Sequence, residues 1–421
     1  MLQEYYTISD VALLLDISQK AVRKHIAAGN IQYEKVNGSY HIPKNALDNF
    51  TDNCTKKEPI NYDLFGQPVA DEEQKIKRKK DCINWADISG FWDNIPHSRM
   101  TFVDLFCGAG GLSKGLEMAG LNGICGLDIF KEAGMTYRRN FSHPFVLGDI
   151  KQQECKNYFY NIVDNTLDGR QLNIVAGGFP CQGFSMAGNR IVDDPRNSLY
   201  KEMLEIVHRL RPEWVICENV KGLRTMLGGK VEKRIIEDYK EIGYEMNVTT
   251  LCAANYYTPQ KRDRVIFIGN RIGAKNYHPM PILKPNQYIT TGQAIGDLIN
   301  HPEDPAFNHV PTKHTPEMQK RMIECPEGKS LYKGYGDAWK KCPWNEASCT
   351  IKENHGGVNV HPKLPRVLTA REMARLQSFP DDFIFEGTKS KQLVQIGNAV
   401  PCFLGKAIGL AVRYSNNDLQ I

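Results

Sequence analysis

The sequence lacks the features that mark several classes of protein. Its 12 cysteines include no Cys-x-x-Cys pair, so neither a zinc ribbon nor the disulfide scaffold of a small secreted domain is indicated. No apolar run reaches the length of a membrane span, and polar residues follow Met1 where a signal peptide would be apolar. Internal repeats are also missing. We therefore expect a cytoplasmic protein with reduced thiols, no metal site and no membrane partner.

Length and composition indicate a globular protein with more than one folding unit. The 421 residues are too many for one ordinary domain. Hydrophobic residues make up 41% and charged residues 24%, which excludes a largely disordered chain. Lys and Arg number 53 against 48 Asp and Glu, a net charge of 53 − 48 = +5. This mild excess is compatible with a nucleic-acid partner but does not identify one.

Residues 1–50 have the pattern of a small domain that begins with two helices. Ser9 can cap a first helix, and a short turn at Asp16-Ile17 ends it. Ser18 can cap a second helix over residues 19–28, which Gly29-Asn30 ends.

A β-hairpin is predicted after these helices. Residues 31–36 and 40–42 flank Asn37-Gly38, a dipeptide that favours a tight turn, and residues 44–50 suggest a last helix. Two helices and a two-stranded wing resemble the excisionase and MerR-type winged helix-turn-helix modules that bind DNA. A small protein-interaction domain is the alternative. The resemblance implies that four residues of the second helix meet the major groove or its phosphates: Gln19, Lys20, Arg23 and Lys24.

Residues 51–98 read as a polar linker. An acidic cluster at 71–73 is followed by basic residues between 75 and 80. A solvated linker accounts for this composition, and phosphate contact by the basic cluster is the alternative.

From residue 99 short apolar runs alternate with amphipathic stretches. The strand candidates are residues 101–106, 124–128, 172–176, 214–218, 244–251 and 265–269. The helix candidates include residues 112–119, 199–210, 231–242, 370–377 and 402–413. This alternation predicts an α/β fold, a mostly parallel sheet with helices on both faces. Residues 271–365 lack the alternation, so we expect a small irregular domain inserted between catalytic segments 99–270 and 366–421.

A glycine-rich loop follows the first strand and opens a helix. Its glycines would let a ligand approach the backbone at the helix N-terminus. Ser113 stands where the dinucleotide fingerprint has its third glycine, which argues against a nicotinamide dehydrogenase. Asp128 ends the second strand, where an acid can accept hydrogen bonds from ribose hydroxyls, and Asp149 could accept from an exocyclic amine. An adenosine-type cofactor is indicated; a purely structural tight turn is the alternative.

Cys181 and Glu218 follow two other buried strands. The loop Gly177-Gly178-Phe179-Pro180-Cys181 would expose a thiol, which is a soft nucleophile suited to an electron-poor carbon. The structural alternative, a small buried cysteine, fits Cys217 or Cys252 better. A buried carboxyl such as that of Glu218 could donate a proton to an aromatic heterocycle.

Three polar residues alternate before the last strand of this series. Alternation would place Gln260, Arg262 and Arg264 on one face, where a guanidinium could hold a carbonyl or a phosphate. A salt-bridged sheet edge is the alternative.

In this order the motifs resemble the bacterial DNA cytosine carbon-5 methyltransferases. The matching segments are Asp104-Leu105-Phe106-x-Gly108-x-Gly110-Gly111, Pro180-Cys181-Gln182, Glu218-Asn219-Val220, Gln260-x-Arg262-x-Arg264, Arg371-Glu372 to Pro380, and Gly397-Asn398-Ala399-Val400-Pro401. The resemblance covers residue 101 to the C-terminus except 271–365. It implies a Rossmann-like S-adenosylmethionine-dependent methyltransferase fold, with residues 271–365 as the target-recognition domain.

The resemblance also implies a cofactor pocket for S-adenosylmethionine. Phe106 and Gly108 would lie near its methionine part, Asp128 would hold the ribose and Asp149 the adenine amine. At Ile129 the family often has an aromatic residue that stacks on adenine, so that contact should be weaker here. The remaining residues implied for the pocket are Gly110, Gly111, Leu112, Ile150, Phe179, Pro180, Leu199, Asn398, Ala399 and Val400.

The family's chemistry assigns Cys181 as the nucleophile that adds to carbon 6 of a flipped cytosine. Glu218 would bond ring nitrogen 3 and the exocyclic amine, and Arg264 the base carbonyl, with Arg262 beside it. Further DNA contacts are expected from Gln182, Ser185 and Gln260.

The expected partner is double-stranded DNA with a recognition site of four or five base pairs, bound by a monomer. A cognate restriction endonuclease and the protein's own promoter are further expected partners, the latter through the N-terminal module. Two rival interpretations stay open. One is a tRNA cytosine methyltransferase of the same superfamily, and the other is a catalytically silent DNA-binding regulator.

Overall fold

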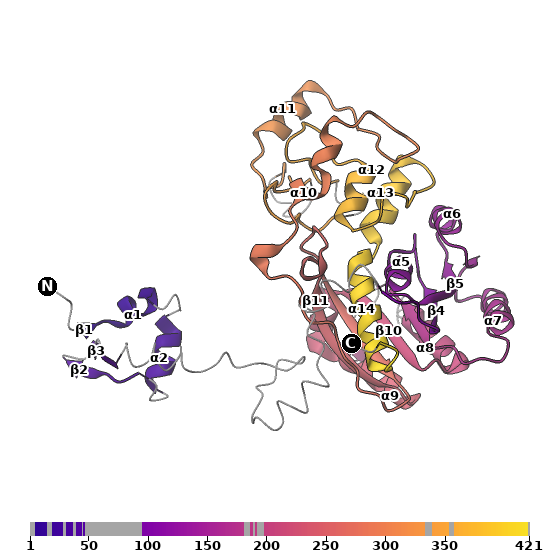
Figure 1. Cartoon of the computed structure of the whole chain (residues 1–421), viewed down its shortest axis with the longest axis horizontal. Helices are drawn as coiled ribbons and strands as arrows, with labels where there is room; N and C mark the ends of the chain where they lie inside the picture. Colours follow the sequence, from indigo (N-terminus) through magenta and orange to yellow (C-terminus); the bar gives the residue numbers. More distant parts are fainter. Residues whose placement is uncertain are drawn as a thin grey trace. The chain divides into compact units, whose positions relative to one another are not determined.

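The computed structural model describes residues 5–14, 19–27, 31–36, 39–43, 45–46, 95–180, 186–187, 190–191, 198–332, 339–352 and 358–419 (Figure 1). The chain divides into two compact units, residues 1–82 and residues 83–421. Of the predicted linker, only residues 95–98 fall in the described part of the chain.

The N-terminal unit is a helix pair with a small antiparallel sheet. Its elements are β1 (Tyr5–Tyr6), α1 (Ile8–Leu14), α2 (Gln19–Ala27), β2 (Glu34–Val36) and β3 (Ser39–Pro43). Val36 pairs with Ser39, so the hairpin is connected by two residues, as Asn37-Gly38 predicts. The strand order is β1-β3-β2, and the sheet therefore has three strands where the sequence suggested two. Val11, Val22 and Ile42 lie in the core beneath it.

Helix α1 is capped by Thr7, which corrects the expectation for Ser9. The Thr7 amide donates to Asp10 Oδ2 at 2.8 Å, and the Asp10 amide donates back to Thr7 Oγ1 at 3.3 Å. Ser9 instead accepts a hydrogen bond from Gln19 Nε2 at 3.1 Å, which links the two helices. Ser18, and the expected last helix apart from residues 45–46, lie outside the described residues.

The larger unit is built on a seven-stranded sheet. Its strands are β4 (Thr101–Leu105), β5 (Asn122–Asp128), β6 (Phe145–Leu147), β7 (Ile174–Gly177), β10 (Trp214–Val220), β11 (Glu245–Cys252) and β12 (Asp263–Asn270). They lie in the order β11-β12-β10-β7-β4-β5-β6. β12 is antiparallel to both of its neighbours, and the other adjacent pairs are parallel. The mostly parallel sheet is thus confirmed, and β6 is the strand that the sequence analysis missed.

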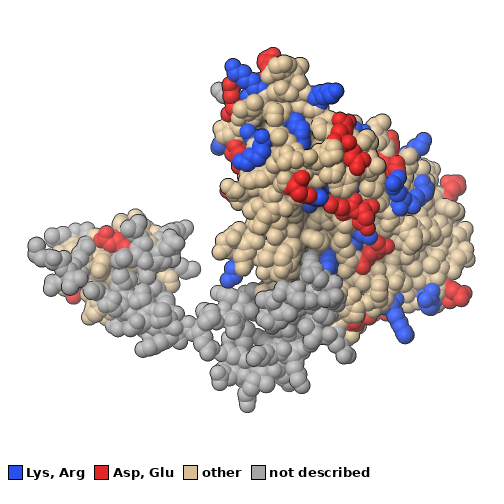
Figure 2. Space-filling view, turned by 45° about the horizontal axis from the view of Figure 1, so that its top comes forward, with Lys and Arg blue, Asp and Glu red and all other residues tan. Residues whose placement is uncertain are grey.

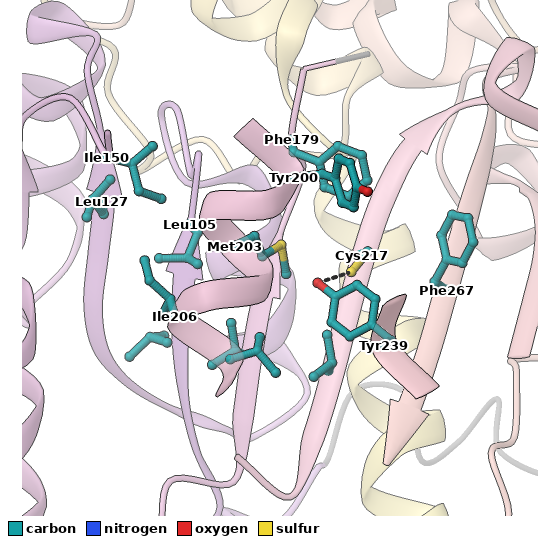
Figure 3. Close-up of a cluster of buried hydrophobic side chains, with 14 of the residues drawn as sticks. Leu105, Leu127, Ile150, Phe179, Tyr200, Met203, Ile206, Cys217, Tyr239 and Phe267 are labelled. Carbon is teal, nitrogen blue, oxygen red and sulfur yellow. Dashed lines mark hydrogen bonds between the residues drawn. The ribbon is translucent and has the colours of Figure 1, made fainter. Parts of the chain in front are cut away.

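Helices cover both faces of this sheet (Figure 1). They are α5 (Gly111–Met118), α6 (Lys131–Asn140), α7 (Gln153–Leu167), α8 (Ser198–Leu210), α9 (Lys230–Glu241) and α14 (Cys402–Ser415). Two further helices, α12 (Ala370–Leu376) and α13 (Lys389–Asn398), share a core with the inserted region. Helices α7, α8 and α9 pack on one face around Leu105, Met203 and Tyr239, in the core drawn in Figure 3. Helices α5, α6 and α14 lie on the opposite face, where α5 and α6 reach Asp104 and Gly126.

Helices α5 and α14 pack backbone to backbone. A Cβ on Gly115 would lie 2.4 Å from the Cys402 carbonyl oxygen, and one on Gly405 would lie 3.1 Å from the Gly115 Cα. Only glycine permits this approach. By length and composition alone, residues 389–415 could cross a membrane. However, 78% of the 18-residue window that meets this criterion is buried inside the protein. They form two core helices of this unit, α13 and α14.

The inserted region is irregular, as predicted. Its described helices are η4 (Pro285–Gln287), α10 (Thr291–Ile295), η5 (Gly296–Asn300) and α11 (Pro316–Glu324). Ile351 and Val360 share a core with Met373 and Phe379, so the region packs on the C-terminal segment. The remaining short elements are β8 (Met186–Ala187), β9 (Arg190–Ile191), η2 (Lys221–Gly229) and η3 (Ala253–Tyr256). On the face in Figure 2, basic and acidic side chains are interspersed over the larger unit.

Candidate active site

The strand order brings the predicted residues to one edge of the sheet. β10, β7, β4, β5 and β6 are successive parallel neighbours, so their carboxyl ends meet at this edge. The residues near or just beyond these ends are, in the same order, Glu218, Phe179, Gly108, Asp128 and Asp149. The chain leaves β4 and β7 in opposite directions across the sheet, and ligands of open α/β sheets bind at such a switch point.

Gly108 is the position where the glycine loop faces open space. Its φ is +53°, and a Cβ placed there would meet nothing within 4 Å. The two other glycines serve packing, because a Cβ on Gly110 would lie 2.4 Å from the Phe141 ring and one on Gly111 would lie 2.3 Å from the Val400 carbonyl oxygen. Gly108 thus gives a ligand access to the backbone, while Gly111 lets residues 399–400 close against the loop.

The Asp128 carboxylate holds the glycine loop in place through hydrogen bonds. Its Oδ2 accepts a hydrogen bond from the Gly108 amide at 2.8 Å, and its Oδ1 accepts one from the Phe130 amide at 2.8 Å. Burial raises the pKa of this carboxyl. Ile129 beside it is 67% exposed, so its apolar side chain is available to a ligand. Asp149 Oδ1 accepts from the Lys151 amide at 3.0 Å.

The other residues expected in the cofactor pocket occupy different depths. Leu112, Ile150, Phe179 and Val400 are buried, Phe106, Leu199 and Ala399 are half-buried, and Pro180 and Asn398 are exposed. Phe106 has a φ of +56°, a strained backbone conformation in the turn that leads from β4 to Gly108. The exposed residues could contact a ligand at the carboxyl edge of the sheet, whereas the buried residues pack beneath this edge.

A buried hydrogen-bonded chain, which sequence reasoning missed, lies beneath the glycine loop. Ser113 Oγ donates to Asp104 Oδ2 at 2.6 Å, and the same hydroxyl lies 2.9 Å from Tyr137 Oη, which lies 2.8 Å from His143 Nε2. Burial raises the pKa of Asp104 to about 7 and lowers that of His143 to about 4. The available signal was an acid inside an apolar strand together with Ser113 at the third-glycine position.

Glu218 and Arg264 form an ion pair at the end of β10. Arg264 Nε lies 2.7 Å from Glu218 Oε1, and each side chain is 12% exposed. The adjacent Asn219 donates from Nδ2 to the Phe179 carbonyl oxygen at 2.9 Å. This bond ties the residues just before Cys181 to the strand that carries Glu218. Cys181, Gln182 and Ser185 lie outside the described residues.

Arg262 and Gln260 are buried, and the hydrogen bonds that their side chains donate go to residues outside the pair. Arg262 donates to the carbonyl oxygens of Ile351, Gly397 and Ala399, and burial lowers its pKa. The Gln260 side chain is fully buried and donates to the Leu376 carbonyl oxygen and to Gln377 Oε1. A direct DNA contact by Gln260 is at odds with this burial. The shared face expected for these residues fails because β12 begins only at Asp263.

A cavity of about 740 Å³ opens beside the ion pair. One wall comes from Val220, Lys221 and Arg264 of the sheet edge, and the opposite wall from residues 327–352 of the inserted region. Four lysines line it, namely Lys221, Lys261, Lys340 and Lys352, together with three acids, Asp263, Glu327 and Glu346. The cavity places Arg264, the partner of Glu218, within reach of a ligand held between the sheet and the inserted region.

Comparison with known proteins agrees with this geometry. The family described as C-5 cytosine-specific DNA methylase matches residues 100–413, and the family described as helix-turn-helix domain matches residues 5–55. Type II methyltransferase M1.HphI of Haemophilus parahaemolyticus is 36% identical over an alignment of 333 positions, which covers 76% of this chain and 88% of that protein. Type II methyltransferase M.Eco47II of Escherichia coli is 30% identical over an alignment of 446 positions, which covers 98% of this chain and 96% of that protein.

Solved structures share the fold. A DNA modification methyltransferase encoded within a prophage in E. coli superposes with a TM-score of 0.61 and 24% identity, over 76% of this chain and 99% of that one. The Entamoeba histolytica methyltransferase EhMeth gives a TM-score of 0.54 and 17% identity, over 77% and 100%.

Proposed function

Because the chain belongs to the family of C-5 cytosine-specific DNA methylases, we propose that it is the modification methyltransferase of a type II restriction-modification system. It methylates carbon 5 of one cytosine within a short duplex sequence. The observation that carries this proposal is the Asn219–Phe179 bond, which ties the residue two positions before Cys181 to the strand bearing Glu218. Cys181 follows β7 in the sequence and Glu218 lies near the end of the adjacent strand β10, so a nucleophile and a carboxyl would meet near the open space at Gly108, as the reaction needs.

S-adenosylmethionine fits the described residues. The open space at Gly108, the exposed Ile129 and the half-buried Asp128 border one region of the carboxyl edge. Asp128 would bind the ribose and Asp149 the adenine amine, and Asn398 would lie at the rim of the pocket. When bound, S-adenosylmethionine supplies an electrophilic methyl group for carbon 5. The pocket needs both ends of the catalytic unit, since Gly111 meets Val400.

Cys181 would add as a thiolate to carbon 6 of a cytosine turned out of the duplex. The electron pair of the carbon 5–carbon 6 double bond then moves toward carbon 5 and ring nitrogen 3. Glu218 stabilises this charge by hydrogen bonding to nitrogen 3 and to the exocyclic amine, while Arg264 holds the base carbonyl and orients Glu218. Carbon 5 can then accept the methyl group. Loss of the carbon 5 proton restores the double bond and expels the thiolate.

Arg262 acts as a positioning residue in this scheme. Its three carbonyl partners come from the inserted region and from residues 397–399, so it holds both against the start of β12. Residues 271–365 would select the recognition sequence, with DNA in the cavity beside Arg264.

The N-terminal unit would bind the protein's own promoter and regulate its synthesis. The support is the match of residues 5–55 to a helix-turn-helix family and the exposure of Gln19 and Arg23 on α2. Lys20 and Lys24 lie on the same helix, with side chains outside the described part. Footprinting that protects methylation sites alone, and no site in this promoter, would refute autoregulation.

Methyl transfer from labelled S-adenosylmethionine to mixed duplex DNA, followed by bisulfite sequencing, tests the activity. Wild-type protein should methylate cytosines within one short motif, and Cys181→Ser should abolish the transfer. Absence of transfer by the wild-type protein, together with tight binding to one promoter fragment, would instead identify a regulator. We expect the enzyme to act as a monomer in the bacterial cytoplasm, at the nucleoid, beside a cognate endonuclease that shares its site.

A further inference from the structure

Two thiols face one another in the inserted region. The sulfurs of Cys342 and Cys349 lie 3.9 Å apart, the only thiol–thiol contact among the described residues. Cys342 is fully buried, whereas Cys349 is half-buried and lines the cavity beside Arg264. Cys349 therefore borders the cavity, and the buried Cys342 lies next to it.

The surroundings favour Cys349 as the reactive member of the pair. The hydrogen bond with Cys342 lowers the pKa of Cys349, and the charge of Lys340 and the Asn359 amide act in the same direction. Asn359 Nδ2 donates to the Cys349 sulfur at 3.1 Å. For Cys342 the same thiol–thiol bond and its burial raise the pKa. A thiolate with an adjacent resolving thiol is the arrangement of redox-sensitive cysteine pairs.

We propose that Cys342 and Cys349 form a reversible intrachain disulfide that makes DNA binding sensitive to peroxide-type oxidants. The Cys349 thiolate attacks one oxygen of hydrogen peroxide, which breaks the O–O bond, gives the sulfenic acid and releases hydroxide. Cys342 then loses its proton and attacks the Cys349 sulfur, forming the S–S bond and expelling the sulfenic oxygen as water. Two thiols are oxidised, and one peroxide is reduced to two waters.

The disulfide would change the cavity wall. A disulfide bond is about 2 Å long, so the sulfurs must approach by about 2 Å from their present separation. Cys349 would move away from Asn359, and its neighbour Ser348 is hydrogen-bonded to residues 259 and 261, which lead to Arg264. The Cys342 amide donates a hydrogen bond to the Val360 carbonyl oxygen, which fixes the backbone at Cys342. Closing the pair therefore pulls on the wall formed by residues 343–350.

The test uses the full chain carrying Cys181→Ser, so that the proposed catalytic thiol does not react. The reduced protein is treated with about one equivalent of hydrogen peroxide, alkylated, digested without reductant and analysed by mass spectrometry. A peptide linking Cys342 to Cys349, lighter by two hydrogens and lost on treatment with dithiothreitol, is expected. Cys217 and Cys402 are the matched controls, since both are buried and burial raises their thiol pKa.

Two further variants assign the roles. With Cys342→Ser added, Cys349 should stop at a sulfenic acid that dimedone traps; with Cys349→Ser added, Cys342 should stay unmodified. Linkage of Cys349 to another cysteine, or oxidation of Cys349 without the linked peptide, would overturn the pairing.

The effect on DNA is measured by binding of the same Cys181→Ser protein to a mixed pool of duplex fragments. Oxidation should weaken binding by about threefold or more, reversibly, and the protein that also carries Cys342→Ser should not respond. Equal affinity before and after disulfide formation would overturn the effect on DNA binding. Neither measurement involves methyl transfer, so failure here is distinguishable from failure of the proposed activity.

Discussion

Arg264 Nε lies 2.7 Å from Glu218 Oε1, and the register of β10 against β12 fixes this contact. Arg264 pairs with Val220, two residues beyond Glu218 on the same strand. Side chains two apart in a strand point to the same face, so the guanidinium reaches diagonally to the carboxylate. The carboxylate is thereby oriented before any base arrives, which is the preorganisation that stabilises developing charge.

Arg264→Ala should therefore lower kcat by about a hundredfold while the KM for S-adenosylmethionine stays within about twofold. Arg209→Ala is the matched control. Its ion pair with Asp164 is exposed and lies outside the cavity lining, so its removal should change kcat by less than about twofold. Steady-state methyl transfer measures both variants. Equal losses in the two variants would show that the contact with Glu218 has no special role.

Asn219 should act on the base site without contacting the cofactor. Asn219→Ala removes the hydrogen bond to the Phe179 carbonyl oxygen and the one from the Val220 amide, so kcat should fall at least tenfold. The lost bonds should also cost about 1–3 kcal/mol of stability. Asn219→Asp keeps the acceptor for Val220 and loses the donor to Phe179. If Asn219→Asp retains the wild-type kcat, the hydrogen bond from Asn219 to the Phe179 carbonyl oxygen does not contribute to catalysis.

Gly108→Ala separates ligand binding from folding. Gly108 and Gly169 both have positive φ and open space around a Cβ, so alanine at either should cost about 1 kcal/mol of stability. Only Gly108→Ala should lower the affinity for S-adenosylmethionine, by about tenfold or more, because its methyl group enters the proposed pocket. Equilibrium dialysis and thermal unfolding measure the two effects. Unchanged affinity in Gly108→Ala would place the cofactor elsewhere.

Arg262→Met should reduce stability more than Arg264→Ala does. It removes a donor from three carbonyl oxygens at the junction of the inserted region and residues 397–399, and among the described residues only that of Ala399 keeps another hydrogen bond, from Gln377 Nε2 at 3.3 Å. The expected cost is about 3 kcal/mol, measured by urea unfolding. A variant of wild-type stability that has lost only kcat would assign Arg262 to the base instead.

Asp104 gives the protein a specific pH dependence. Its folded pKa of about 7 lies above the ordinary 3.8, so its contribution to stability is fully present below pH 3.8 and is lost as the pH rises toward 7. The ionised side chain should cost up to about 4 kcal/mol at neutral pH. Asp104→Asn should remove this decline, while Asp164→Asn, at an exposed ion pair, should preserve it. Unfolding free energies at pH 5 and pH 8 compare the two. Parallel pH profiles for wild type and Asp104→Asn would contradict the burial argument.

The chemistry-bearing residues could be predicted because they follow strands with strong local signals. Asp128 ends β5 as expected, and Glu218 lies near the end of β10. Both belong to buried apolar runs bounded by polar residues, a pattern that is visible in the sequence. The position of Cys181 after β7 follows from the same reasoning, although its geometry lies outside the described residues.

The non-local features could not be predicted in this way. The antiparallel direction of β12 and the three-residue strand β6 depend on tertiary pairing and leave little local pattern. Gln260 and Arg262 show the same limit, since the period of two applies only inside a strand and both precede β12. Their burial depends on residues 351, 376–377 and 397–399, more than eighty positions away.

The backbone contact between α5 and α14 has a consequence for the nascent chain during synthesis. The ribosome produces the glycine loop well before residues 397–415, yet the nearest contacts of Gly111 and Gly115 come from that later segment. A nascent chain would thus carry its target-recognition region well before its cofactor pocket is complete. Translation itself would delay methylation until synthesis has passed α14, so a prematurely terminated polypeptide could occupy DNA without marking it.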